Sequence, residues 1–275
     1  MSRSLLGISV AAVLCVGHAA SANVFDSFLV DARSSDIVVL GEIHDNPEHH
    51  AIQAEAVQAL SPDAIVFEMI PQEKSSEVNA LRSEGATRNE LAEALNWDES
   101  GWSDFDFYAP ILEAAPSALI LGAARPVSDI FAAAESGAAA VFGSNASRFG
   151  LDLALDLAEL KVRKDEMAVA HCDALPESML GGMVEVQRLR DADLAQQAVA
   201  ALEDTSIAQV VIVTGNGHAD RRWGAPVAIG KAAPMRKIVV LGLVEPGWNG
   251  EEAFDFIMTR DAPVRDDPCA VFEDS

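Results

Sequence analysis

The stretch LGEIHDNPEHH, residues 40–50, places three of the chain's six histidines beside three carboxylates. It follows the apolar run IVV and precedes AIQAEAVQAL, which has the composition of a helix. Imidazole nitrogens and carboxylate oxygens bind transition metals and transfer protons. This turn is therefore the first place in the sequence to expect a site.

Side chains of the same kinds follow other apolar runs. Runs at 37–41, 64–68, 118–122, 210–215 and 237–244 predict strands. In open parallel sheets, ligands collect beyond the carboxyl ends of the strands, so the residues found there deserve inspection. Those residues are Glu42 and His44, Glu68, Arg125, and His218 at the end of the segment GNGH.

Four of these residues, Glu42, His44, Glu68 and His218, carry donors suited to a divalent transition metal. They are distant in sequence, and only their shared place at strand ends predicts that they converge. The alternative stays open. Glu42 and His44 would then cap the following helix, and Glu68 would be a buried, hydrogen-bonded acid.

Other residues have two interpretations each. His49 and His50 follow Pro47, which starts a helix, and neighbouring helical residues point about 100° apart, so at most one faces the place of His44. Tyr108 is the only tyrosine. It lies among aromatics in FDFYAP, where core packing is the simpler interpretation, although a phenolate also ligates ferric haem. Arg125 and Arg221 would pair with haem propionates or with ordinary acids of the chain.

Strands alternate with helix-like stretches, which predicts an α/β fold with a mostly parallel central sheet flanked by helices. The helix-like stretches are 48–60, 74–81, 89–95, 108–114, 128–134 and 179–202. The insertion at 72–115 is expected to form a helical cap, and the tail after residue 260 to be irregular. Aromatic residues gather in the insertion: Trp97, Trp102, Phe105 and Phe107.

The composition excludes some partners. The 275 residues include 19 basic and 43 acidic side chains, for a net charge of -24. Such a field repels phosphate backbones and anionic lipid heads, so no nucleic-acid partner is expected. Half of the residues are apolar, which suffices for one large α/β domain.

The N-terminus has the pattern of a signal peptide over residues 1–22: Arg3, an apolar stretch at 5–16, and small residues up to Ala22. The mature chain, 23–275, is then expected in the periplasm or outside the cell. The apolar stretch is short for a membrane span. Leu14 precedes Cys15 where an acylation signal has a small residue, which disfavours a lipid anchor. In an oxidising compartment, Cys172 and Cys269 are expected to form a disulfide rather than two separate buried thiols.

Six segments together resemble one family. They are LGEIHDNPEHHAIQ, IVFEMIPQE, WDESGWSDFDFYAPIL, AHCDALPE, QRLRDADLA and VIVTGNGHADR. In this order they resemble the ChaN-like haem-binding uptake proteins, within the wider Tiki/TraB and erythromycin-esterase-like group. The resemblance implies an α/β fold, haem as cofactor, iron uptake together with other uptake components, and a dimer that holds stacked haems. It also implies a tyrosine ligand near a histidine. The tyrosine here can only be Tyr108. Together with the residues singled out above by position and chemistry, the expected haem-binding residues are Tyr108, His44, His49, His50, Arg125 and Arg221.

A second function follows from the same resemblance. Tiki-like relatives use a Gly-x-x-His motif and acids for metal-dependent proteolysis, and GEIH matches at Gly41 and His44. The alternative to haem binding is therefore a metal-dependent hydrolase that uses Glu42, His44, Glu68 and His218. The aromatics of the insertion suit a flat apolar ligand better than an extended peptide, so haem binding ranks first. A third interpretation is a cluster that only stabilises the fold.

Overall fold

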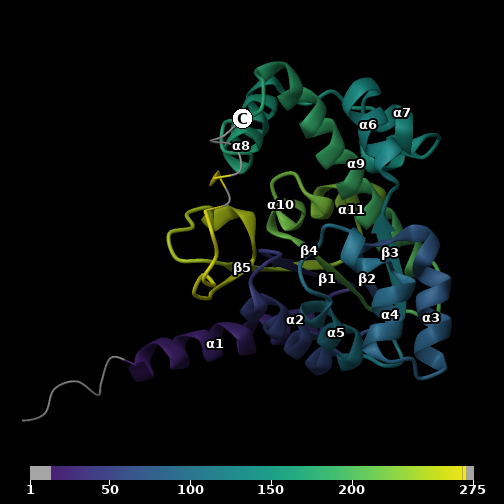
Figure 1. Ribbon diagram of the computed structural model, residues 1–275, viewed down its shortest axis with the longest axis vertical. Helices are drawn as coiled ribbons and strands as arrows, with labels where there is room; N and C mark the ends of the chain where they lie inside the picture. The colour runs from purple at the N-terminus through teal and green to yellow at the C-terminus, as the bar shows by residue number, and fades with distance from the viewer. Residues whose placement is uncertain (1–13, 268, 271–275) are drawn as a thin grey trace, which may run out of the picture.

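The chain folds around a parallel sheet with helices on both faces (Figure 1). The computed structural model describes residues 14–267, 269 and 270. Within them the sheet has the order β3-β2-β4-β1-β5-β6, and each pair of neighbours runs parallel. The strands are β1 (Ile37–Glu42), β2 (Ala64–Pro71), β3 (Leu119–Ala124), β4 (Val210–Gly215), β5 (Ile238–Val244) and β6 (Phe256–Thr259).

The strands are apolar on both faces because both faces are covered. In β1 all six residues are buried, and Val38 and Leu40 join one core cluster while Ile37 and Val39 join the other. Such continuous β-branched runs are typical of parallel sheets between two helix layers. The pattern that predicted strands therefore also predicted the layers.

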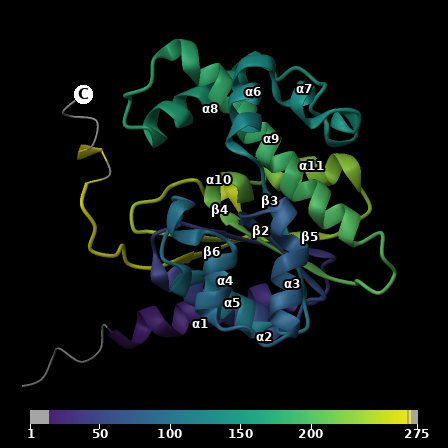
Figure 2. The ribbon, with the colours of Figure 1, turned by 45° about the vertical axis from the view of Figure 1, so that its right-hand side comes forward.

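The two layers differ in their helices (Figures 1 and 2). One consists of α1 (Leu14–Ala32), α2 (Pro47–Leu60), α3 (Ser75–Ser83), α4 (Arg88–Ala94) and α5 (Phe105–Ala114). The opposite layer consists of α6 (Val127–Ser136), α7 (Ala138–Phe142), α9 (Glu177–Ala201) and α11 (Ala225–Ala232), with α8 (Leu157–Ala170) packed on α9 and α10 (Asn216–Ala219) directly after β4. Short 3₁₀ turns are η1 (Gln72–Lys74), η2 (Trp97–Glu99), η3 (Ala146–Phe149) and η4 (Glu251–Ala253).

The predicted fold class is confirmed, and the described sheet is parallel throughout. Five predicted strands match β1 to β5 to within a few residues, whereas β6 was not predicted. Among the helices, α1, α7, α8, α10 and α11 were not predicted. The insertion at 72–115 forms α3, α4 and α5, which pack on the same face of the sheet as α2. It is part of this layer, and it reaches the carboxyl edge through Trp102, which packs on His44, and Tyr108, which bonds Glu42.

The start of α2 fixes the HDNP turn. The Asn46 side chain accepts a hydrogen bond from the Glu48 N–H, and Pro47 occupies the first turn of the helix. The Asn46 amide also donates to Glu245 at 2.9 Å and to the Asp261 carbonyl at 3.0 Å. The turn after β1 is thus bonded to the segments that follow β5 and β6.

The C-terminal tail is attached at two points. Arg265 forms ion pairs with Asp45, at 3.1 Å, and with Glu245. Farther along, Cys269 forms a disulfide with Cys172, which lies in the turn between α8 and α9. The predicted disulfide is therefore present, and it closes a sequence separation of 97 residues.

The expected signal peptide, residues 1–22, lies partly outside the described residues; α1 includes the rest of it. None of the helices in the described part of the chain is long and apolar enough to cross a membrane.

The disulfide yields a first prediction. In a Cys15→Ser background prepared without reductant, a thiol assay under denaturing conditions should find no reactive cysteine. Cys269→Ser should lower the free energy of unfolding by up to about 4 kcal/mol, because a long closed loop constrains the unfolded chain. Two reactive thiols per molecule in the background variant would contradict the bond.

Candidate functional site

Four of the expected site residues, Glu42, His44, Glu68 and His218, meet at the carboxyl edge of the central strands. Glu42 ends β1 and pairs in register with Gly215, the last residue of β4. His44 follows β1 by two residues, and Glu68 lies in β2 on the other side of β4. His218 lies in α10, directly after β4. The parallel register brings together four residues that are separated by up to 176 positions in the sequence (218 minus 42).

Glu42 is the centre of the first group. Its carboxylate is 1% exposed, and Oε1 accepts hydrogen bonds from His44 Nδ1 at 2.8 Å and from the Tyr108 hydroxyl at 3.1 Å. His50 Nδ1 lies 3.1 Å from Oε2. Burial by itself favours the neutral acid, but the bond from His44 and the proximity of His50 outweigh it and lower the pKa of Glu42. Glu42 is therefore a buried carboxylate held through Oε1, while Oε2 has no hydrogen-bond partner among the described residues.

The bond to Glu42 determines which His44 nitrogen is free. With the proton on Nδ1 directed at Glu42, the lone pair lies on Nε2, the arrangement found in carboxylate–histidine–metal triads. Burial disfavours the imidazolium, yet the bond to Glu42 and the charge of Glu68 raise the pKa of His44. Nε2 faces Gly215, where an added Cβ would lie 2.7 Å from it. A glycine is needed here to leave room for the imidazole.

Glu68 is the centre of the second group. Its Oε2 accepts bonds from Thr214 Oγ1 at 2.6 Å and from the Gly215 N–H at 2.8 Å. Arg190 Nη2 lies 2.5 Å from Oε1, and His218 Nε2 lies 3.4 Å from the same oxygen. Burial would raise the pKa of Glu68, but the charges of His218 and Arg190 lower it well below its usual range. Glu68 is thus an ionised acid whose oxygens are already bonded.

His218 links Glu68 to a buried acid of α9. Its Nδ1 lies 2.6 Å from Asp191 Oδ1 and 3.1 Å from Gln187 Nε2. Asp191 is 2% exposed, and burial raises its pKa. Contacts from Glu68 to His218 and from His218 to Asp191 therefore connect the edge of the sheet with α9.

Three side chains form the accessible part of the site. The His44 side chain is 34% exposed, and its ring centroid lies 4.9 Å from that of Trp102. The Arg190 guanidinium is 5.7 Å from the Trp102 ring centroid, and its side chain is 31% exposed. An imidazole, an indole and a guanidinium therefore face solvent together.

His49 and His50 do not reach this opening, because both are buried. His49 Nδ1 accepts the Ile43 N–H at 3.0 Å, and burial lowers the pKa of His49 to about 4, so it is neutral at pH 7. His50 is packed between Phe107 and Tyr108, with Nε2 2.9 Å from the His44 carbonyl. In this structure the two histidines hold the turn that carries His44.

Tyr108 lies in the interior. It is 1% exposed, packs against Trp97 and His50, and uses its hydroxyl to hold Glu42. Burial first, and then the charges of Glu42 and Glu68, raise the pKa of Tyr108 above its ordinary value. Its role as an axial ligand stays a prediction, and in this conformation its hydroxyl orients a carboxylate instead.

The expected arginines are engaged elsewhere. Arg125 forms two bonds to Asp193, at 2.6 and 2.7 Å, and joins the end of β3 to α9. Arg221 pairs with Asp255 and approaches the carbonyl of Ile238, at the opposite end of β5. Neither contacts the group at the carboxyl edge. The arginine that does is Arg190, which lies within the segment QRLRDADLA and was overlooked there.

The four candidate metal ligands do not form one ligand set. Among the described residues, no three His, Cys, Asp or Glu side chains are arranged to hold a metal ion. The Glu68 oxygens are bonded to Thr214, Gly215 and Arg190, and those of Glu42 face His44, Tyr108 and His50. A hydrolytic metal centre would have to replace several of these bonds, so the geometry gives the hydrolase alternative no support.

Comparison with one solved structure shows the same fold. The structure titled "Cofacial heme binding to ChaN of Campylobacter jejuni" superposes with a TM-score of 0.67 at 22% identity, covering 85% of this chain and 90% of that one. The type III effector HopBA1 gives a TM-score of 0.48 at 12% identity, covering 87% of this chain and 94% of that one. No curated protein sequence matches significantly.

The sequence itself matches one family model over residues 28–229, which is more than half of the chain. That model describes haem-binding uptake proteins of the ChaN type in the Tiki superfamily. The matched range includes β1 to β4 and each of the edge residues described above. By this match the chain belongs to the ChaN family of haem-binding uptake proteins.

Proposed function

We propose that this chain binds haem at the opening formed by His44, Trp102 and Arg190. His44 Nε2 would hold the iron, the Trp102 indole would lie against the macrocycle, and Arg190 would pair with a propionate. The carrying observation is the Glu42–His44 pair, which fixes an imidazole with a free Nε2 at a half-exposed edge. Bound haem would supply a ferric iron with an open coordination position.

The three residues fit the three chemical parts of haem. A neutral imidazole nitrogen is a common axial ligand. A large aromatic ring gives apolar contact for a flat ring system. A guanidinium recognises a carboxylate, and the distance of 5.7 Å already places Arg190 over Trp102. Family membership favours the same ligand.

We further propose that the chain acts after export, with residues 1–22 removed, and exchanges haem with other uptake components. The Cys172–Cys269 disulfide supports this location, since such bonds persist in oxidising compartments. Pairing of two copies around stacked haems is the assembly that the resemblance implies, and sedimentation of the haem-loaded chain would test it.

The ligand assignment yields a second prediction. Haemin titration of the wild type should give a saturable Soret shift, and His44→Ala should abolish or strongly weaken it. Glu42→Gln should weaken binding by about 10–100-fold, the usual cost of removing a group that orients a metal-bound histidine. Tyr108→Phe should weaken haemin binding less than Glu42→Gln does, because it keeps the bond between Glu42 and His44.

The control for this series is His171→Ala, a histidine at the end of α8 outside the opening. It should bind haemin like the wild type. If Tyr108→Phe loses binding and any phenolate-to-iron band while His44→Ala binds normally, Tyr108 is the ligand and the assignment to His44 is wrong. If the wild type shows no saturable shift, the proposed function itself fails.

Arg190 yields a third prediction. Wild type should bind haemin more tightly than haemin dimethyl ester, whose propionates carry no charge. Arg190→Met should reduce that preference by about tenfold, the scale of one charge-assisted contact. Arg148→Met, at an exposed arginine paired with Glu203, should leave the preference unchanged. If Arg190→Met and the wild type prefer haemin over its dimethyl ester equally, the proposed contact between Arg190 and a propionate is wrong.

A further inference from the structure

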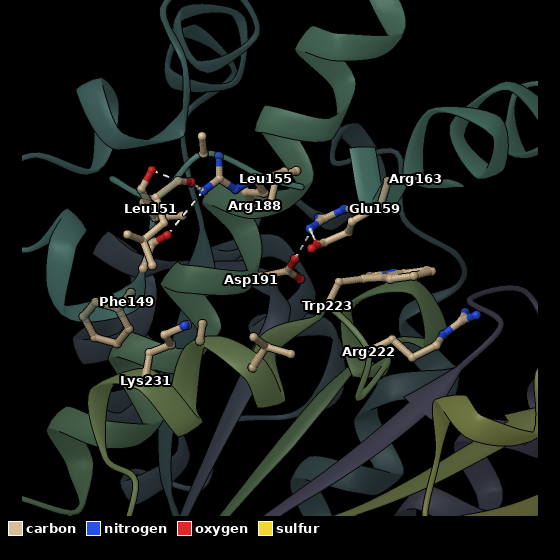
Figure 3. A pocket seen from close by; sticks show the side chains of 15 residues that line it. Phe149, Leu151, Leu155, Glu159, Arg163, Arg188, Asp191, Arg222, Trp223 and Lys231 are labelled. Carbon is tan, nitrogen blue, oxygen red and sulfur yellow. Dashed lines mark hydrogen bonds and ion pairs between the residues drawn. The ribbon is translucent and has the colours of Figure 1, made fainter. Parts of the chain in front are cut away.

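A pocket of about 220 Å³ lies in the helix layer that contains α8, α9 and α11 (Figure 3). Its walls come from α8, α9 and α11, from η3 and the segment that follows it, and from the segment between α10 and α11 that carries Arg222 and Trp223. His44, Trp102 and Arg190 do not line it. The proposed haem function therefore leaves this pocket without a role.

The pocket is basic although the chain is acidic. Four of the 19 lysines and arginines of the chain lie among its 15 lining residues, against two acids. Because the chain as a whole carries a net charge of -24, this local concentration of cations is notable. The cations are Arg163, Arg188, Arg222 and Lys231, and the acids are Glu159 and Asp191.

Two of the four cations already have strong partners. Arg188 donates to Glu185 at 2.7 Å and to the Leu153 carbonyl at 2.8 Å. Arg222 is bonded to Asp220, with Nη2 2.6 Å from Oδ2. These two shape the pocket but have little charge left for a ligand.

Arg163 is different because it is buried without full pairing. It is 4% exposed, and its bond to Glu159 is long at 3.4 Å. Its Nη2 has no hydrogen-bond partner and lies 3.7 Å from Asp191 Oδ2, which also has none. A buried guanidinium N–H without an acceptor is costly, so an acceptor placed beside Nη2 would be strongly favoured.

Lys231 provides a second unneutralised charge at the rim. It is exposed and forms no ion pair with any residue in the described ranges. Its stem lies along Gly150, where an added Cβ would be 3.2 Å from the Lys231 Cδ. In Figure 3 its amine points into the space between Phe149 and Asp191.

The remaining wall is apolar and partly aromatic. Phe149, Leu151 and Leu155 line it together with Trp223. The Arg222 guanidinium covers one side of the Trp223 ring at 4.0 Å, and Figure 3 draws Arg163 on the opposite side of the indole. An apolar body could therefore lie on the indole while its polar end reaches Arg163.

We infer that this pocket binds a compact carboxylate with an apolar body, whose oxygens accept from Arg163 and whose body contacts Trp223 and Leu151. Lys231 attracts the anion at the entrance. The volume is below the range of about 300–1,000 Å³ typical of drug-sized ligands, which excludes haem and selects a smaller occupant.

The test uses benzoate and its neutral counterpart benzamide on the full chain without haem. Titration calorimetry and tryptophan fluorescence should show saturable benzoate binding, and benzamide should bind at least about tenfold more weakly. Trp223→Phe should remove the benzoate-dependent fluorescence change, which locates the ligand among the four tryptophans.

Two variants test the charges. Arg163→Met and Lys231→Met should each weaken benzoate binding and reduce the preference over benzamide. Lys161→Met is the matched control, since this α8 lysine is 74% exposed, pairs with Asp165 and does not line the pocket. Lys231 is exposed, so its variant should fold even where Arg163→Met does not.

The inference is overturned by any of three results: no saturable benzoate binding, equal binding of benzoate and benzamide, or equal benzoate binding by Lys231→Met and Lys161→Met. Haemin titration of Lys231→Met should match the wild type, because the pocket does not include the haem opening. This separates failure of the pocket from failure of the proposed haem site.

Discussion

The buried carboxylate of Glu42 is the constraint on which the site depends. An ionised acid at the end of a central strand is costly unless donors face it. His44 from the turn and Tyr108 from α5 donate to Oε1, and His50 of α2 lies 3.1 Å from Oε2, which has no hydrogen-bond partner among the described residues. Removing one of them would leave charge unpaired in the core. The same contacts that hold Glu42 also orient the exposed imidazole, so stability and function share one set of bonds.

Much of the fold could be predicted because burial on both faces leaves a strong pattern in the sequence. The apolar runs at β1, β2 and β4 predicted the parallel sheet, and that in turn predicted a common edge for Glu42, Glu68 and His218. Short or polar elements gave no such pattern: α10 has four residues, and α8 has only Arg163 as a buried residue. A helix that buries so little carries no clear hydrophobic period.

The roles of individual residues depended on contacts that no spacing reveals. Arg125 and Arg190 are equally plausible partners of a carboxylate in the sequence. Both are paired with an acid, Arg125 with Asp193 and Arg190 with Glu68. Their difference is that Arg190 also lies over the Trp102 ring, beside His44. Tyr108 is a similar case, since the exposure of a lone tyrosine depends on which face of α5 turns inward. A residue's chemistry could be read from the sequence, but its accessibility could not.

Accessibility also distinguishes His44, the proposed ligand, from Tyr108, which contacts the same carboxylate from the core. In the described structure Tyr108 and His44 contact the same oxygen of Glu42 from opposite environments, one in the core and one at a half-exposed edge. To bind iron, a side chain needs an approach path and a lone pair. In neutral His44, the bond from Nδ1 to Glu42 leaves the lone pair on Nε2. For Tyr108 to bind iron, α5 would have to expose an aromatic core residue and leave Glu42 with one donor fewer. The arrangement with the lower free energy keeps the Tyr108 phenol buried, where it bonds Glu42, which in turn orients His44.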